Sequence, residues 1–120
     1  MAKLNFNTRD ELISIDLDLV AAFKAEGSYA QAVYITQRKY MLNATLSQVD
    51  EALTPYRQAG YKFLRLGRGI IINHKFLSRI LVTQQLLILS TGDANDLKIK
   101  VPRQVLRQYK DAVAKSGQQM

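Results

Sequence analysis

The alternation of apolar and polar side chains predicts a chain built mostly of short strands. Seven segments rich in β-branched, aromatic or aliphatic residues are bounded by polar turns. These strand candidates are residues 12–15, 29–36, 39–43, 61–66, 76–82, 85–89 and 97–101. Residues 17–25 are apolar without a clear period, and they stay open between strand and helix. Residues 1–11 are predicted to form a polar lead-in.

Polar turn signals separate the strand candidates. Residues 26–28 mark the first turn, because Gly27 readily adopts the backbone conformations that tight turns need. Residues 37–38 form a two-residue connection that fits a hairpin, although they lack the glycine or asparagine that such turns prefer. Residues 90–96 form a polar turn before the last strand.

Apolar residues at helical spacing predict one helix inside the chain. Thr45 and Gln48 have the form of a capping box, in which each side chain bonds the free backbone N–H of the other residue. Pro55 has no N–H for the helical hydrogen-bond ladder, so we expect the helix to end near Thr54. The residues that share its apolar face are Leu46, Val49, Leu53 and Tyr56.

A second stripe at helical spacing predicts a C-terminal helix over residues 103–115. Pro102 precedes it, where a missing N–H costs little, and residues 116–117 end it. The stripe consists of Val105, Leu106, Tyr109, Ala112 and Val113. The predicted fold is therefore mostly β, with compact antiparallel strands, a short internal helix and a C-terminal helix. We expect one domain over residues 12–116, followed by a tail at residues 117–120.

Composition narrows the class of protein. A chain of 120 residues suits one domain with one core, and 48% hydrophobic residues excludes wholesale disorder. The longest apolar run, residues 69–72, is far shorter than the roughly 20 residues of a membrane span. The sequence has no secretory-signal pattern and no cysteine, so we expect neither disulfides nor thiolate metal sites. These features favour a cytoplasmic protein.

Charge is distributed unevenly along the chain. Residues 1–56 contain five basic and seven acidic side chains, whereas residues 57–120 contain twelve basic and three acidic ones. The net charge of +7 is therefore concentrated in the second half. Such a concentration favours an anionic partner, either nucleic acid or an anionic membrane. A generic basic surface explains the same charge and stays open as an alternative.

Three strings occur in the order and spacing of a known family. Residues 23–29 contain a strand end, a turn of acidic, glycine and polar residues, and a tyrosine that opens the next strand. Residues 63–73 contain a phenylalanine, two arginines, an apolar trio and an asparagine, and Ile80 follows. Residues 100–103 join the last strand to the last helix. In these strings the chain resembles the LytTR-type DNA-binding domains of bacterial transcription regulators over roughly residues 12–115.

The resemblance implies sequence-specific binding of double-stranded DNA in transcription regulation. It implies loops that enter the major groove and a homodimer on repeated half-sites. The sequence carries no enzyme signature, and its residues lead us to expect no enzymatic activity, cofactor, metal or membrane partner. Where the family commonly has His-Arg-Ser, this chain has Gly67, Arg68 and Gly69, and Arg103 follows Pro102 instead of serine. These departures from the family pattern affect the expected DNA sequence preference, and they hardly affect the expected fold.

Two arginines are the first candidates for contacts with DNA bases. The resemblance implies that Arg68 projects from a loop at a strand end, and that Arg103 begins the last helix beside free N–H groups that face phosphate. The planar arginine fork can donate two hydrogen bonds to guanine O6 and N7. Ser28, in the first loop of the resemblance, is the third candidate for a base contact. The candidate phosphate contacts are Tyr29, Arg65, Lys75, Lys100 and Arg107.

Structural roles compete with several of these assignments. Arg68 and Arg103 also fit solvated arginines of a turn and a helix, and Tyr29 also fits a core-facing residue of a strand. We interpret Asn73 as structural, because its amide can bond nearby backbone and cap the following turn. His74 is the only histidine and lacks the sequence partners of a zinc or catalytic site, so we expect it to be exposed.

Two further functions stay open. Gly67 and Gly69 favour a protein-interaction or oligomerisation domain that keeps the fold but has lost specific DNA reading. Attachment to an anionic membrane ranks last, because the basic C-terminal helix has neither tryptophan nor phenylalanine. Whether the chain stands alone or is a fragment of a larger regulator also stays open.

Overall fold

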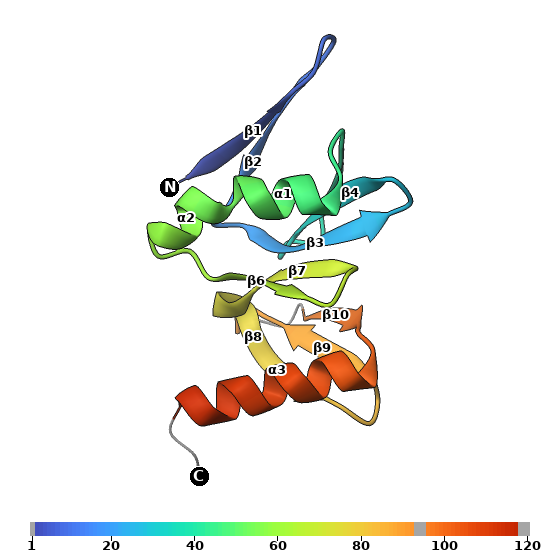
Figure 1. Ribbon diagram of the computed structural model, residues 1–120, viewed down its shortest axis with the longest axis vertical. Helices are drawn as coiled ribbons and strands as arrows, with labels where there is room; N and C mark the ends of the chain where they lie inside the picture. Colours follow the sequence, from blue (N-terminus) through green and yellow to red (C-terminus); the bar gives the residue numbers. More distant parts are fainter. Residues whose placement is uncertain (1, 93–95, 118–120) are drawn as a thin grey trace. The chain divides into compact units, whose positions relative to one another are not determined.

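Antiparallel strands make up most of the computed structural model, which describes residues 2–92 and 96–117 (Figure 1). The chain divides into two compact units, Met1–Lys75 and Phe76–Met120. The predicted fold class, mostly β with a short internal helix and a C-terminal helix, is confirmed. The boundaries of the single domain expected over residues 12–116 stay a prediction.

The first unit is built around a five-stranded antiparallel sheet with the order β5-β4-β3-β7-β6. Its strands are β3 (Val20–Glu26), β4 (Tyr29–Tyr34), β5 (Lys39–Leu42), β6 (Phe63–Leu66) and β7 (Ile70–Asn73). Strand β3 settles the segment that the sequence left open, because it pairs with β4 along one edge and with β7 along the other. No strand was predicted at β7. All its residues are buried, so it lacks the alternation that reveals a half-buried strand.

Helix α1 (Leu46–Ala52) packs against β3, β4 and β7. The predicted capping box is confirmed: the backbone N–H of Gln48 donates to Thr45 Oγ1 at 3.1 Å, and that of Thr45 donates to Gln48 Oε1 at 2.8 Å. The helix ends earlier than predicted, and Pro55 lies in the first turn of a second short helix, α2 (Thr54–Gln58). Helix α2 was not predicted, because proline ends a helix when it stands in the interior, whereas the first turn tolerates it well.

An N-terminal hairpin covers part of the core of this unit. It consists of β1 (Lys3–Asn7) and β2 (Leu12–Asp16). Phe6 pairs with Ile13 and Leu4 with Ile15, so the apolar residues share one face, which packs against the core cluster. Strand β1 lies within residues 1–11, which were predicted to be a polar lead-in. The lysine and asparagines of β1 make the segment polar on average, but they alternate with apolar residues, as in a half-buried strand.

The second unit is a three-stranded antiparallel sheet with one longer helix. The elements are β8 (Leu77–Leu81), β9 (Leu86–Leu89), β10 (Leu97–Lys100) and α3 (Arg103–Ser116), with the strand order β10-β9-β8. All four were predicted, with slightly wider strand bounds. Leu106 and Tyr109 on α3 are buried, and burial raises the pKa of Tyr109, whereas Ala112 of the predicted stripe is exposed. The predicted turn at 90–96 and tail at 117–120 lie partly outside the described residues.

Candidate functional site

Two turns of the five-stranded sheet lie side by side at one end of it (Figure 1). The β3–β4 turn consists of Gly27 and Ser28, and the β6–β7 loop consists of residues 67–69. The backbone N–H of Ala25 on β3 donates to the carbonyl of Gly69 at 2.9 Å. The loop is therefore joined to the strand that leads into the turn.

The connection between β5 and α1 reaches the same end of the sheet. The backbone N–H of Ala30, near the start of β4, donates to the carbonyl of Ala44 at 2.8 Å. We call this end the loop end of the sheet, defined by residues 27–29, 43–45 and 67–69. Three connections that are far apart in the sequence thus meet there, on a sheet whose strands hold them in place.

Ser28 and Tyr29 are both exposed at the loop end. Gly27 has a φ of +60°, as the first position of a type II′ hairpin turn requires. Tyr29 is 50% exposed, so the alternative of a core-facing tyrosine is wrong. Tyr29 borders a cavity of about 280 Å³ whose apolar lining includes Phe6, Ile13 and Met41.

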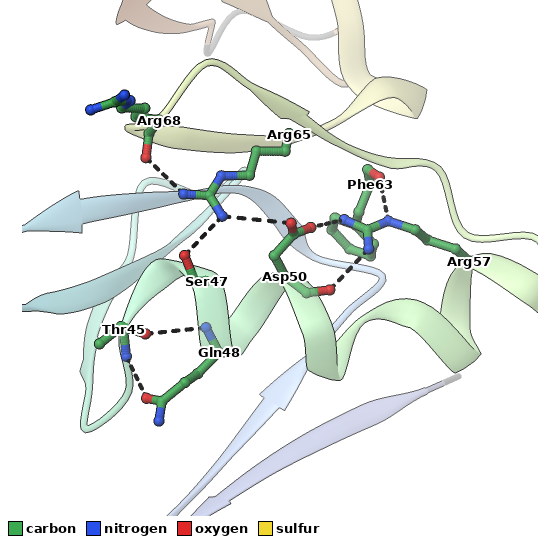
Figure 2. Close-up of polar contacts among 8 residues, drawn as sticks. All are labelled: Thr45, Ser47, Gln48, Asp50, Arg57, Phe63, Arg65 and Arg68. Carbon is green, nitrogen blue, oxygen red and sulfur yellow. Dashed lines mark hydrogen bonds and ion pairs between the residues drawn. The ribbon is translucent and has the colours of Figure 1, made fainter.

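Arg68 is the middle residue of its three-residue loop, and it is exposed. Gly67 has a φ of +65°, a left-handed conformation that glycine adopts without strain. Within residues 2–92 and 96–117, no hydrogen bond or ion pair engages the Arg68 guanidinium. In Figure 2 that guanidinium points away from the polar network behind it. Arg68 therefore presents free donors at the tip of a tight loop.

Arg65 is half-buried and has several partners inside the protein (Figure 2). Its Nη1 lies 3.1 Å from Ser47 Oγ and 3.6 Å from Asp50 Oδ2, and its Nη2 donates to the carbonyl of Arg68 at 3.0 Å. Arg57 donates to the other carboxylate oxygen of Asp50. This network was not predicted, because nothing in a periodic pattern links a carboxylate on a helix to an arginine on a strand.

Asn73 lies at the opposite end of β7 from the loop end. It is buried; its Nδ2 donates to the carbonyl of Val20 at 2.9 Å, and its Oδ1 accepts from the backbone N–H of Lys75 at 3.3 Å. Its structural role is confirmed. The expectation that His74 is exposed was wrong, because the residue is half-buried and its backbone N–H donates to the carbonyl of Lys62 at 2.8 Å.

Lys75 is exposed, but the sheet separates it from Arg68. It follows the end of β7 that lies away from the loop end, and its Nζ lies 3.9 Å from Asp18 Oδ1. Strand β7 alone spans about 10 Å at roughly 3.3 Å per residue. The phosphate contact expected of Lys75 stays a prediction, and its position sets it apart from Ser28 and Arg68.

Basic residues of the second unit gather where β10 passes into α3. Lys100 is the last residue of β10 and Arg103 the first of α3. Arg103, Arg107 and Lys110 recur at intervals of four and three residues, so they form one exposed basic stripe on the helix. No ion pair within the described part of the chain engages these three side chains. Pro102 offers no capping side chain to the free N–H groups of the first turn.

The predicted contact residues therefore fall into separate groups. Ser28, Tyr29, Arg65 and Arg68 lie at the loop end or beside it, Lys100, Arg103 and Arg107 at the start of α3, and Lys75 apart from both. The described residues hold no cluster of histidine, cysteine, aspartate or glutamate side chains that suits a metal ion. No helix in the described ranges is both long and apolar enough to cross a bilayer.

Known proteins show where this fold belongs. The LytTr DNA-binding domain family matches residues 10–114, and no curated protein matches the chain. The fold is similar to the LytTr DNA-binding domain of a Bacillus cereus protein described as a methyl-accepting/DNA response regulator, with a TM-score of 0.63 and 16% identity. That similarity covers 95% of this chain and 98% of the other. Because the family match spans most of the sequence, the chain belongs to the LytTr DNA-binding domain family.

Proposed function

We propose that this chain binds double-stranded DNA at specific sequences and acts in transcription regulation. Membership of a DNA-binding family supports the binding of DNA. The observation that best supports sequence-specific binding is the way in which the loop presents Arg68. Its carbonyl is held by Arg65 at 3.0 Å, while its guanidinium is exposed and has no partner within the described residues. An arginine presented in this way is ready to donate both arms of its fork to a base edge.

The loop end of the sheet is the proposed reading surface of the first unit. Arg68 and Ser28 contact bases there, and the hydroxyl of Tyr29 donates to a phosphate. The hydrogen bond from Ala25 to Gly69 supports joint action, because it joins the two turns at one end of one sheet. The major groove, about 12 Å wide, has room for protein segments as wide as a helix or a strand pair.

The start of α3 is the proposed contact surface of the second unit. Arg103 reaches a base edge, while Lys100 and Arg107 bind phosphates. The free N–H groups of the first turn add attraction for a phosphate. Lys110 extends the same stripe, and we add it to the phosphate contacts although the sequence did not single it out. The phosphate contact of Lys75 remains part of the proposal, to be decided by substitution.

We also propose that two copies bind together on repeated half-sites. Single small modules bury about 600–1,000 Å² of protein surface on DNA, and a second copy doubles the number of bases read. A homodimer is therefore part of the proposal, as is a location in the cytoplasm, where a bacterial regulator meets DNA.

A protein-interaction domain of the same fold is the second candidate. The observation in its favour is an apolar surface, since Leu12, Tyr29 and Met41 are each at least half exposed, at 57%, 50% and 51%. Two of these side chains line the same cavity. Exposed apolar side chains that cluster are typical of surfaces that bind other proteins.

Selection of bound sequences from a random pool of duplexes tests the proposal. We expect an enriched motif, repeated when two copies bind together. A pool that shows no enrichment over the starting duplexes would refute specific reading and favour the interaction domain.

A further inference from the structure

One carboxylate on α1 joins two arginines that hold both ends of β6 (Figure 2). Asp50 Oδ1 accepts from Arg57, whose Nε donates to the carbonyl of Phe63 at 2.8 Å, at the start of the strand. Asp50 Oδ2 lies 3.6 Å from Nη1 of Arg65. Beyond the end of the strand, Nη2 of Arg65 donates to the carbonyl of Arg68 at 3.0 Å. The network therefore ties the loop of Arg68 to the helix.

The loop itself has little stiffness of its own. Gly67 and Gly69 widen the range of backbone conformations open to it. A Cβ added at Gly69 would meet no atom within 4 Å, so that side of the loop faces open space. Two hydrogen bonds restrain the backbone, one from Ala25 to Gly69 and one from Arg65 to Arg68. Among the described residues, the second of these bonds is the one that acts on the residue with the exposed guanidinium.

We infer that Arg65 is a positioning residue that acts on DNA reading through Arg68, and that Asp50 holds Arg65 in place for this task. The inference rests on the proposed function. The side chain of Arg65 is 27% exposed and already engages Ser47, Asp50 and the carbonyl of Arg68. Few of its donors are left for a phosphate, so this role replaces the phosphate contact expected from the sequence. Restraint of the carbonyl limits the directions in which the Arg68 side chain leaves the loop.

Binding of two duplexes separates positioning from a phosphate contact. The affinities of Arg65→Gln and Arg65→Lys are measured for the selected duplex and for a random duplex at one salt concentration. We expect both variants to weaken the selected duplex by about tenfold, within the about 5- to 150-fold that one bidentate base contact is worth. Binding to the random duplex should change less than about twofold. Lysine keeps the charge, but its single ammonium cannot reproduce the planar fork that spans these partners.

A double substitution tests whether the effect passes through Arg68. In an Arg68→Ala background, Arg65→Gln should add less than about twofold to the loss on the selected duplex, because the group that it positions is gone. Asp50→Asn is a further test, because it should change the affinities for the two duplexes in different directions. Loss of a negative charge should leave the random duplex bound as tightly or more tightly, while the selected duplex is bound more weakly.

A matched control removes the same charge elsewhere in the unit. Arg38 is exposed in the β4–β5 turn, at the far end of the sheet from the loop end, so Arg38→Gln should leave the ratio of the two affinities unchanged. Thermal unfolding of every variant shows that it is folded. Equal losses on both duplexes for Arg65→Gln, with Arg65→Lys bound like the wild type, would show a phosphate contact and overturn the inference.

Relaxation of the backbone amides in the DNA-free protein tests the restraint on its own. We expect the order parameters at Gly67, Arg68 and Gly69 to fall from about 0.85 to below about 0.6 in Arg65→Gln, with the strands unchanged. Unchanged order parameters in the loop would overturn the inference even if specific binding is found. A wild-type protein that prefers no duplex would refute the proposed function instead, and the relaxation data would still decide whether Arg65 restrains the loop.

Discussion

Arg68 and Arg107 are both exposed arginines, but their backbones suit them to different tasks. Arg68 stands at the tip of a loop whose neighbours lack side chains, so its guanidinium can approach a base edge closely. Arg107 stands on the surface of a regular helix, between Arg103 and Lys110 in a stripe of like charge. Such a stripe matches the regular spacing of phosphates better than the hydrogen-bond pattern of one base pair.

Substitution of single basic residues separates contacts with DNA bases from contacts with DNA phosphates. Arg68→Ala and Arg103→Ala should each lose about 1–3 kcal/mol of binding free energy on the selected duplex while largely keeping the affinity for random duplex. Arg107→Ala and Lys75→Ala should weaken both duplexes alike, because phosphate contacts carry no sequence information. Fluorescence anisotropy with both duplexes measures the difference. Proportional losses for all four variants would count against direct reading by Arg68 and Arg103.

Asn73 is a buried polar residue of the sheet whose side chain bonds the backbone on both sides. Asn73→Ala removes the donor to the carbonyl of Val20 and the acceptor for the N–H of Lys75. A buried group left without its partner costs about 1–3 kcal/mol, so the free energy of unfolding should fall by that amount. Urea denaturation followed by circular dichroism measures it. Asn43→Ala, at an exposed asparagine, should change stability by less than about 0.5 kcal/mol, and a similar loss there would contradict the assignment.

At the scale of elements, α1 supports the loop end in two ways. Its buried residues Leu46 and Val49 belong to the hydrophobic core that α1 forms with the sheet. Its exposed face carries Ser47 and Asp50, which hold Arg65. Seven residues alone form a helix poorly in water, so α1 depends on its cap and its packing. Its stability therefore affects the loop that Ser47 and Asp50 help to restrain.

The capping box of α1 gives a prediction at this scale. Thr45→Ala removes the acceptor for the N–H of Gln48, and it should lower the free energy of unfolding by about 1 kcal/mol. Thermal unfolding monitored by circular dichroism measures the shift. Thr36 is an exposed threonine outside the helices, and Thr36→Ala should stay within about 0.5 kcal/mol of the wild type. An equal loss in both variants would mean that the cap contributes nothing of its own.

At the scale of the whole molecule, the two units carry similar net charges. Ten basic and seven acidic side chains give +3 over Met1–Lys75, and seven basic and three acidic ones give +4 over Phe76–Met120. The acidic side chains cluster in the first unit, and three of them, Asp18, Asp50 and Asp16, serve the protein's own contacts with lysine, arginine or backbone N–H groups. The start of α3 keeps an exposed basic stripe. Long-range attraction of a duplex is thus expected from both units.

Salt dependence tests this picture of the molecule. If three to five phosphates are neutralised, the association constant should fall about 40- to 500-fold between about 50 and 200 mM salt, because each neutralised phosphate releases condensed counterions. A salt titration of the wild type measures the slope, and Arg107→Ala should reduce it by about one phosphate. An affinity that stays constant over this range would exclude DNA as an electrostatically bound partner.

The sequence by itself determined the elements in which one side is covered and the other is not. The stripe of α3 follows from periodicity, because one-sided burial leaves a repeat in the chain. The capping box of α1 follows from two residue types three positions apart. The family resemblance also located Arg68 and Arg103 as exposed arginines at a loop and a helix start. Strand β1 also alternates between apolar and polar residues, but its polar residues led to the prediction of a lead-in instead of a strand.

Only the tertiary structure decided what those elements do to one another. It placed β7 between β3 and β6, brought the turn of Ser28 beside the loop of Arg68, and left Lys75 at the other end of the sheet. It also turned Arg65 toward Asp50. The physical reason is that pairing between distant strands, and contacts between single polar side chains, leave no periodic trace in either segment. Burial of all of β7 likewise erases the alternation that would have revealed it.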